Sequence, residues 1–517
     1  MSPDFNVSWV AALVPEIMLA VVLFALQIYD RVAKPQQRNR LGLFTAWGAF
    51  ITLLVTFGLW FLGGEPSGQV GLGETLIWGG MIRHDLVTFV FRIMFLVALI
   101  ITSLISMDVP RLQKIEYYAL LITATMGFSL MGAASDLIMV YIALEMASIS
   151  SYVLAGMLKT SDRSTEAGMK YFVYGAFATG IMLYGMSLVY GITGHTNFYT
   201  IAGGFSLQIP TIAQAQQQFG PEGVAAVQSV NGVFLLAAVM IIVGFGFKIS
   251  AVPFHFWTPD VYEGAPTPFT AFVSTGSKAA GFAVFIRLFT AGVFGAPNDG
   301  SAWWAMLVAM CIITMTLGNF AAIFQNNIKR MLAYSSIAQA GYALIGLVTM
   351  TSDGSGATMF YLLMYIFTNT AAFGVIILVS NVSQSDQMED FYGLNRRSPY
   401  LALVMLFALL SLGGIPPTAG FVGKFFIFRA AIDAGYWWLA AIGILNAFVA
   451  LYYYLNVVKY MYLYRSENES VEIPVSRPAQ VGLAVSMLFI IVLGTFYASP
   501  AFDLTREAAT AFYTLIG

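Results

Sequence analysis

The stretch LLAAVMIIVGFGFKISAVPFHFW (235–257) is apolar over a membrane-spanning length, yet it contains Lys248 near its centre. A bare lysine at mid-bilayer costs roughly 2.5 to 3.5 kcal/mol on insertion scales, so such residues persist mainly where they line an ion path or hold a partner charge. Lys278 and Lys424 lie in two further apolar segments. The pattern predicts a membrane protein that moves charge.

The composition of the whole chain also indicates that a bilayer is its solvent. Of the 517 residues, 59% are hydrophobic and only 10% are charged, and the mean hydropathy is +0.78, which is far from the average of soluble domains. One cysteine and three histidines offer no ligand set for an iron–sulfur cluster, zinc or a bis-histidine haem. The net charge of −2 argues against nucleic acid as a partner. We therefore expect no metal and no cofactor on this chain.

The spacing of the apolar segments predicts an all-α polytopic membrane fold. About 20 apolar residues cross the hydrocarbon core, and the chain holds about fourteen such segments. We expect them at 9–29, 41–62, 84–107, 116–134, 136–158, 166–192, 231–262, 268–292, 302–325, 329–350, 356–380, 399–434, 436–463 and 479–499.

Two of these segments, 231–262 and 399–434, are too long for one straight helix. Both contain proline and clustered glycines, so both are predicted to be broken helices. Non-helical backbone at membrane depth is tolerated only where protein or a water-filled cavity surrounds it. Because Lys248 and Lys424 lie at the two breaks, each break is a candidate for half of a polar pathway.

The two broken helices are the seventh and the twelfth of the expected series, which is the spacing of two five-helix repeats. An odd number of helices per repeat inverts the second copy in the membrane, as in many transporters. We expect an N-terminal three-helix segment, a first repeat with its break near Lys248, an inverted second repeat with its break near Lys424, and a C-terminal helix and tail. Their boundaries are 1–115, 116–292, 302–463 and 464–517.

The loops indicate how the chain lies in the membrane. Nearly all loop lysines and arginines fall on one side, whereas the other side receives only Arg83 and Arg506. The positive-inside rule makes the first side cytoplasmic and places both termini outside. Arg92 and Arg287 fall within spans near their ends, and we read them as snorkelling to the interface or contacting a partner. The first apolar segment has no basic region ahead of it, so we expect it to be retained, unlike a signal peptide.

Three long runs carry a resemblance to a known family: GFGFKISAVPFHFWTPDVYEGAPTP (244–268), NIKRMLAYSSIAQAGY (327–342) and GGIPPTAGFVGKF (413–425). They resemble the antiporter-like membrane subunits of respiratory complex I, most closely subunit N of bacterial proton-translocating NADH:quinone oxidoreductase. Lys424 stands where M-type subunits are expected to carry a glutamate, and the chain lacks the long amphipathic helix that L-type subunits append. The resemblance implies the same helix count and the same two inverted repeats.

The same resemblance implies which residues form a proton path. Glu145 matches the family's glutamate in the fifth span, and Lys248 is its expected partner. Lys278 matches the central lysine of the eighth span, and Lys424 matches the terminal site. An acid and a lysine that pair at low dielectric keep each other charged, so separating them favours release of a proton.

Lys170 and His255 are the residues that the resemblance suggests for modulation or relay, and both have a simpler interpretation. Lys170 lies one turn after a glutamate, with which it can form an i,i+4 pair at a helix start. His255 among aromatic neighbours is as readily a packing residue. The Glu145–Lys248 pair has a structural interpretation too, and Lys424 could simply reach the membrane interface.

The resemblance further implies that the chain moves protons across the membrane as a non-redox subunit, coupled to quinone reduction in partner subunits. FMN, iron–sulfur clusters and quinone are then bound by the partners, which include the M and L types and small subunits such as the K and J types. We expect the bacterial cytoplasmic (inner) membrane as its location, with a thylakoid or organellar membrane less favoured.

Two other functions stay open at this point. One is a subunit of a multi-subunit sodium/proton antiporter or of a membrane-bound hydrogenase, and the other is a membrane scaffold with structural lysines. Sodium is held by carboxylate or carbonyl oxygens, yet the only plainly intramembrane acid besides Glu145 is Glu16, which disfavours the antiporter. The scaffold predicts unchanged pumping after Lys248→Met or Lys278→Met.

Overall fold

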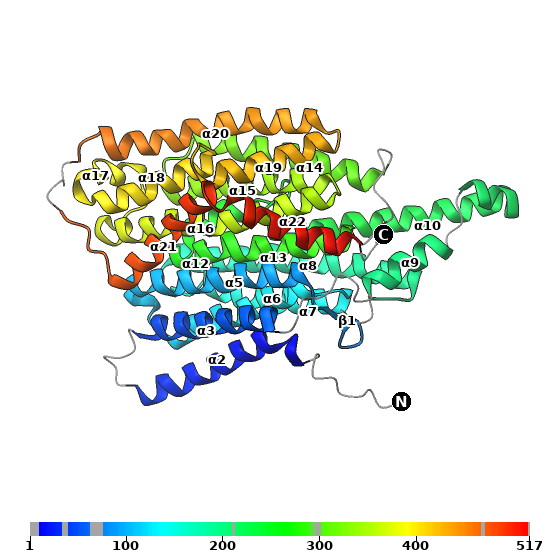
Figure 1. Ribbon diagram of the computed structural model, residues 1–517, viewed down its shortest axis with the longest axis horizontal. Helices are drawn as coiled ribbons and strands as arrows, with labels where there is room; N and C mark the ends of the chain where they lie inside the picture. Colours follow the sequence, from blue (N-terminus) through cyan, green and yellow to red (C-terminus); the bar gives the residue numbers. More distant parts are fainter. Residues whose placement is uncertain are drawn as a thin grey trace.

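The structure, a computed structural model, describes residues 10–33, 40–62, 76–208, 212–290, 293–294, 301–466 and 471–514. Within these residues it is a bundle of helices with a small hairpin, and most helix axes run in a common direction (Figure 1). The two chain ends, which we expect outside, lie beyond the described residues.

In chain order the main elements are α2 (Val14–Val32), α3 (Leu41–Leu62), β1 (Leu76–Ile77), β2 (Ile82–Arg83), α5 (Leu86–Ile105), α6 (Ile115–Ala133), α7 (Leu137–Ala155), α8 (Asp162–Thr193), α9 (Phe198–Gln208), α10 (Ile212–Ile249), α11 (Trp257–Gly264), α12 (Thr267–Phe272), η4 (Val273–Ser277), α13 (Lys278–Thr290), α14 (Ala302–Ile323), α15 (Ile328–Val348), α16 (Ser352–Ser383), α17 (Leu394–Arg397), α18 (Pro399–Gly413), α19 (Ala419–Asp433), α20 (Trp437–Leu463), α21 (Arg477–Gly494) and α22 (Ala498–Thr514).

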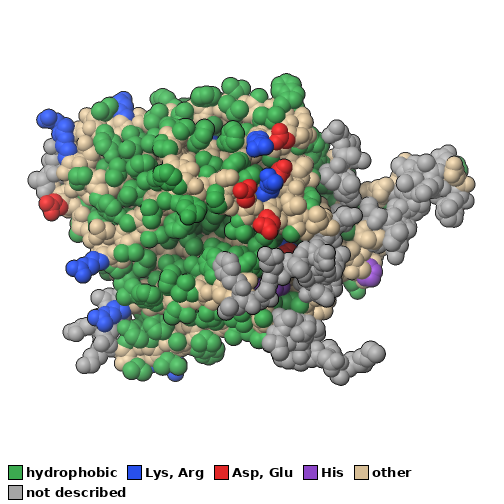
Figure 2. Space-filling model, in the orientation of Figure 1, with side chains coloured by type: hydrophobic (Ala, Val, Ile, Leu, Met, Phe, Trp, Pro, Cys, Tyr) green, Lys and Arg blue, Asp and Glu red, His purple; other side chains and the backbone are tan. Residues whose placement is uncertain are grey.

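Eleven helical segments in the described part of the chain are long and apolar enough to cross a membrane. The protein is therefore a multi-pass membrane protein of α-helices, as predicted. The eleven segments do not include the helices α2, α6, α18 and α19. Large apolar side chains cover the face of the bundle drawn in Figure 2. Exposed examples are Phe24 on α2, Phe177 on α8 and Phe448 on α20, which suits a surface that contacts lipid or other membrane proteins.

Both predicted breaks are present. The backbone leaves the helix between α10 and α11 at Ser250, whose φ is 63°, and between α18 and α19 at Gly414, whose φ is 81°. The second break has a close approach that requires glycine, because a Cβ on Gly420 would overlap the carbonyl oxygen of Ser411. Each break brings helix ends, with backbone groups that have no partner within the helix, into the interior of the bundle.

The expected span 268–292 is not one regular helix. α12 continues through the π-helical turn η4 into α13. A π turn inserts an extra residue into a helix and is frequently found at functional sites. Lys278 is the first residue after this turn, so the turn helps to set the direction in which its side chain points.

Two long helices in the two halves of the chain have matching features. α8 and α16 each contain 32 residues. The side chains of Ser161 and Thr351 accept hydrogen bonds in their first turns, and left-handed Gly194 and Gln384 end them. The same local design therefore occurs twice in the bundle.

The C-terminal segment holds a second helix in addition to the one expected there. After α21, helix α22 lies across the middle of the bundle in the view of Figure 1. Arg506 pairs with Asp353 at 3.7 Å, and the hydroxyls of Tyr513 and Ser355 are 3.1 Å apart. These contacts hold α22 against the start of α16.

Candidate functional site

Glu145 and Lys248 lie in the first half of the bundle, on α7 and in the last turn of α10. Lys248 is only 1% exposed, and the charge of Glu145 acts on it. Within the described residues, Lys248 Nζ and Glu145 Oε1 are both buried without a hydrogen-bond partner. The two groups that the sequence pairs therefore interact at longer range than in a direct ion pair.

Lys278 lies on α13, which packs against the end of α10 that carries Lys248, and it bonds to the other half of the bundle. A Cβ on Gly281, one turn after Lys278, would lie 3.5 Å from Cβ of Lys248, so α13 and α10 pack closely here. The side chain of Lys278 is buried, and its amino group donates to the Ser336 hydroxyl at 2.5 Å and to the Ser336 carbonyl oxygen on α15. Lys278 is thus held by neutral oxygen atoms.

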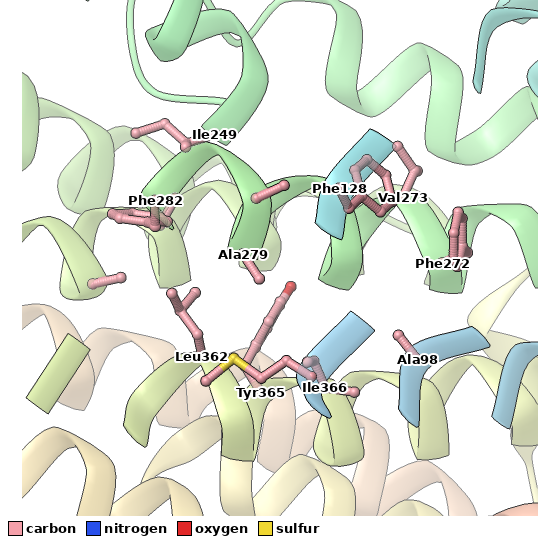
Figure 3. Close-up of a cluster of buried hydrophobic side chains, with 14 of the residues drawn as sticks. Ala98, Phe128, Ile249, Phe272, Val273, Ala279, Phe282, Leu362, Tyr365 and Ile366 are labelled. Carbon is pink, nitrogen blue, oxygen red and sulfur yellow. The ribbon is translucent and has the colours of Figure 1, made fainter. Parts of the chain in front are cut away.

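Two tyrosines complete the surroundings of Lys278. The hydroxyl of Tyr262 on α11 lies 3.2 Å from Oγ of Ser336, and Tyr365 on α16 donates to the same oxygen at 2.9 Å. Figure 3 shows Tyr365 directed toward Ala279 of α13 within an otherwise apolar layer. Lys278 therefore occupies a polar point where α11, α13, α15 and α16 meet.

The polar groups continue past Ser336 along α15. One turn further on, the side-chain amide of Gln339 donates to the carbonyl oxygen of Leu412 and to the hydroxyl of Tyr454, both at 3.0 Å, and accepts a hydrogen bond from Tyr361. These partners belong to α18, α20 and α16. The row of polar groups that runs from Lys278 through Ser336 and Gln339 is named here the polar strip, and it reaches the second break.

Lys424 on α19 lies at the far end of the polar strip. Its side chain is buried, and its amino group donates to the carbonyl oxygens of Leu412 and Gly413 at 2.9 and 3.2 Å. The same nitrogen lies 4.5 Å from the centre of the Tyr342 ring. The side chain is directed against the end of α18, so it does not snorkel outward. The Leu412 carbonyl accepts from Lys424 and from Gln339, which joins the lysine to the strip.

A largely apolar cavity of about 490 Å³ lies beside Lys424, between α19 and α20. Its lining includes Phe421, Phe425, Lys424 and the pair formed by Arg429 and Asp433 at 3.4 Å. Lys424 therefore borders the polar strip on one side and open space on the other.

The uncharged members of the polar strip are not found by a search for buried charges. For that reason the sequence does not indicate four of them: Gln339, Tyr361, Tyr365 and Tyr454. The signal in the sequence is the run NIKRMLAYSSIAQAGY (327–342), in which serines precede Gln339 by three and four positions and so share its helical face.

Lys170 lies away from the polar strip, in a network of partly exposed charges. It pairs with Glu166 at 2.8 Å and with Asp260 of α11 at 2.6 Å. Arg330 of α15 pairs with Asp260 at 2.9 Å and with Glu263 at 3.0 Å. The i,i+4 pair of the simpler interpretation is present, and the additional partner ties α8 to α11.

His255 lies in the break between α10 and α11. It is 5% exposed, its ring packs on Phe256 with the ring centres 4.5 Å apart, and its Nδ1 is buried with no hydrogen-bond partner among the described residues. The packing contact of the simpler interpretation is present, and one ring nitrogen stays free for a relay. In the same residues, no group of three or more His, Cys, Asp or Glu side chains could hold a metal ion.

Arg92 and Arg287 are not snorkelling residues, which corrects the sequence interpretation. Arg92 binds Glu16 at 2.8 Å, and Arg287 binds Asp85 at 2.6 Å, with all four side chains buried. Burial alone would raise the pKa of Asp85, but the charges of Arg287 and Arg83 outweigh it and hold the pKa of this carboxyl well below its usual range. Sequence position within a span does not indicate whether a charge finds such a partner.

Comparison with known proteins identifies close relatives of the chain. The family model described as NADH:quinone oxidoreductase/Mrp antiporter, TM matches residues 134–450. NADH-quinone oxidoreductase subunit N of Moorella thermoacetica is 42% identical over 87% of this chain and 91% of its own length. The protein of the same name from Trichlorobacter lovleyi is 41% identical over 92% of both chains. A chain of respiratory complex I from Thermus thermophilus has a TM-score of 0.73 and 30% identity, covering 95% of this chain and 98% of its own.

Proposed function

The chain belongs to the family of NADH:quinone oxidoreductase and Mrp antiporter membrane subunits, and from this premise we propose that it is the N-type subunit of a proton-translocating NADH:quinone oxidoreductase. Its part is to move protons across the membrane, coupled to quinone reduction in partner subunits. Relatives that match nearly their whole length carry the name of that subunit. Electron transfer itself takes place in the partners.

The observation that carries this proposal is the polar strip between two buried lysines. Lys278 bonds to Ser336, Gln339 follows one turn later on α15, and the Leu412 carbonyl joins Gln339 to Lys424. Buried polar groups are costly in a membrane protein, and intramembrane ionisable residues in particular mark ion or proton paths. A structural scaffold has no need of a bonded row that connects one lysine to the next.

The proton path has a second part in the first half of the bundle. We assign Glu145 and Lys248 to proton loading, because the charge of the acid acts on the lysine without a direct hydrogen bond between them. Lys278 takes the proton next, and Lys424 passes it on beside the cavity of α19 and α20. His255 and Lys170 belong to relay and modulation in this proposal.

Moving one elementary charge across 100 mV costs roughly 2.3 kcal/mol. The attraction of two unit charges about 4 Å apart is roughly 4 kcal/mol at an effective dielectric constant near 20. Bringing the separated charges of Glu145 and Lys248 to such a distance would therefore change the energy by enough to drive one proton step.

The proposal includes two inverted five-helix repeats, 116–292 and 302–463, within a count of about fourteen crossings. The matching lengths, caps and end residues of α8 and α16 support the repeat. Antiparallel bridges of one residue pair also recur, between Asp136 and Asn197 and between Asn327 and Gln387. The flanking segments are 1–115, with three helices, and 464–517.

The assembly in which the chain works follows from the same proposal. FMN, iron–sulfur clusters and quinone are bound by partner subunits, and the membrane neighbours are of the M, L, K and J types. The location is the bacterial cytoplasmic membrane with both termini outside, which agrees with the loop charges. A sodium/proton antiporter would need a cluster of oxygen ligands near the lysines, and the oxygens around Lys278 are engaged by its amino group and by tyrosines.

The test is Lys278→Met in the assembled complex, reconstituted into vesicles. Proton yield per electron is measured with a pH-sensitive dye while NADH oxidation is followed in parallel. We expect the yield to fall because the strip loses its first ionisable group. Unchanged yield, in a complex that is fully assembled, would contradict the proposed function.

A further inference from the structure

Lys424 is a buried lysine without an acidic partner. Among the described residues, its amino group donates to the carbonyl oxygens of Leu412 and Gly413, and no acidic side chain acts on it. An ammonium group has three N–H donors, so these two carbonyls leave one of them. A buried charge is costly unless it is paired and hydrogen-bonded. The charged form of Lys424 therefore calls for one further partner.

The ring of Tyr342 on α15 lies against this amino group. Nζ of Lys424 is over its face, 4.5 Å from the ring centre, which is well inside the roughly 6 Å within which an aromatic face attracts a cation. The attraction is stronger where both groups are shielded from water, and here Tyr342 is 0% and Lys424 4% exposed. The two groups therefore meet the conditions for a strong cation–π contact.

The hydroxyl of Tyr342 is engaged by other helices. Asn319 on α14 donates to it at 2.9 Å, and Tyr453 on α20 donates to the side-chain oxygen of Asn319 at 3.0 Å. All three side chains are buried. The hydroxyl therefore anchors the ring, and the face of the ring is what Tyr342 offers to Lys424.

Close packing of α14 and α15 fixes this anchor in place. A glycine directly precedes each of the two bonded residues, Asn319 and Tyr342. A Cβ on Gly318 would lie 2.6 Å from the backbone nitrogen of Ala338, and a Cβ on Gly341 would lie 2.7 Å from a backbone nitrogen of α14. Small residues let helices in a membrane approach this closely. The backbones of the two helices therefore set the position of the ring.

The other lysine of the polar strip does not have an equivalent contact. Nζ of Lys278 lies 5.9 Å from the centre of the Tyr365 ring, at the limit of the interaction, and bonds to the oxygens of Ser336 instead. Tyr365 contributes through its hydroxyl, which donates to the same serine. Only at Lys424 does the ring face replace a hydrogen-bonding side chain.

We propose that Tyr342 is the positioning residue of Lys424, and that the face of its ring binds the ammonium group in place of an acidic side chain. Attraction to a ring is weaker than attraction to a carboxylate in the same surroundings, so the charged lysine is stabilised without being locked in an ion pair. Lys424 can then accept a proton and release it again, while the ring neither gains nor loses one. The inference rests on the proposed function and adds the residue that holds its last lysine.

The test varies the electron density of the ring without changing its shape. Phenylalanine analogues with one, two or three fluorine atoms are placed at position 342 of the whole complex, because fluorine withdraws electron density from the ring face and alters its size little. Tyr342→Phe is the reference. Proton yield per electron is measured in vesicles, together with melting temperature.

We expect Tyr342→Phe to pump close to the natural chain, because it keeps the ring face. Loss of a cation–π contact corresponds to a roughly 2- to 30-fold change in an equilibrium constant. The yield should therefore fall with each added fluorine, by about half or more at three fluorines, with an unchanged melting temperature. A ring that serves only as packing would give no such trend.

A direct substitution and a matched control complete the design. Tyr342→Leu removes the ring and should lower the yield about as far as Lys424→Met does. Tyr117 on α6 is also 0% exposed, its hydroxyl lies 2.9 Å from that of Ser106, and it is outside the polar strip. The same fluorinated analogues at position 117 should leave the yield unchanged.

The outcomes separate this inference from the proposed function. A yield that does not depend on the number of fluorines, beside a loss in Lys424→Met, overturns the inference alone. A Tyr342→Phe variant that already pumps as little as Lys424→Met also overturns it, because the hydroxyl would then be required and not the ring face. Unchanged yield in Lys424→Met overturns the role of that lysine in the proposed function, and the inference with it.

Discussion

Lys424 and Gln339 donate to the same backbone oxygen, the carbonyl of Leu412, at 2.9 and 3.0 Å. This carbonyl lies near the end of α18, where the helix leaves carbonyl groups without intrahelical partners. The carbonyl end of a helix favours a positive charge. The break in the second half therefore both stabilises the Lys424 ammonium and joins it to the polar strip.

Replacing Lys424 tests whether the strip needs a charge at its end. We expect Lys424→Met to lower the proton yield per electron, because the methionine can neither carry a proton nor bond the α18 carbonyls. Proton uptake and quinone reduction are measured together in reconstituted vesicles. Lys459→Met, at an exposed position on α20, is the control and should pump normally. Equal yields for both variants would remove Lys424 from the path.

Gln339→Leu tests the middle of the polar strip. The change leaves the Tyr361 hydroxyl without its partner, at a cost of roughly 1 to 3 kcal/mol. The Leu412 carbonyl and the Tyr454 hydroxyl each lose one of two partners and keep Lys424 and Ser335. We expect a lower melting temperature and a lower proton yield, even though both lysines are intact. Gln325→Leu, in which only a local bond to the Ala321 carbonyl is lost, should change neither. Normal pumping by Gln339→Leu would show that protons take another route.

Gly420→Ala tests the geometry of the second break. The added Cβ would overlap the carbonyl oxygen of Ser411, and backbone cannot move aside as a flexible side chain does. Overpacking of this kind typically costs about 1 to 3 kcal/mol. We expect a lower melting temperature and less of the chain recovered in the complex. Gly58→Ala on α3, where the Cβ meets nothing within 4 Å, provides the comparison, and a similar melting temperature for both variants would refute the argument.

Asp85→Asn tests the buried ion pair with Arg287. Breaking a buried pair typically costs roughly 3 to 5 kcal/mol, because the other charge is left uncompensated. Since the folded pKa of Asp85 lies below its usual value, its stabilising contribution is present above the unfolded pKa of about 4 and is lost as pH falls through the folded pKa. The difference in free energy of unfolding between the natural chain and the Asp85→Asn variant should therefore be largest at neutral pH and shrink only in stronger acid.

The measurement for Asp85→Asn is thermal unfolding in detergent across this pH range. Asp433→Asn removes an exposed pair with Arg429 at 3.4 Å and should cost less than about 1 kcal/mol. A pH-independent difference for Asp85→Asn would mean that the pair is not the source of the stability.

Several features of the fold could be predicted because they depend on neighbouring residues in the chain. Prolines and clustered glycines mark a break in a helix wherever it packs, so the interruptions before α11 and α19 were predictable. The extra helix α22 was not, because its mixed polar and apolar residues do not resemble a membrane span. The π turn before Lys278 has no signal in the apolar pattern either.

The candidate site was predictable in its charges and not in its connections. A lysine inside an apolar run stands out, so Lys248, Lys278 and Lys424 are found from the sequence. Their bonding partners are not, since Ser336 is 58 positions from Lys278 and Leu412 is 73 positions from Gln339. The expected contact of Glu145 with Lys248 is a longer-range interaction, and the lysine that does bind two acids directly is Lys170.

The sequence by itself determined the solvent, the breaks and the buried charges of this protein. The free-energy cost of a charge in hydrocarbon and the effect of proline or glycine on the helical backbone are properties of single residues, so they can be read from the sequence. The tertiary structure alone decided which neutral groups receive those charges. Hydrogen bonds need atoms about 3 Å apart, and only the packing of helices from both halves of the chain brings Ser336, Gln339 and the end of α18 to the lysines.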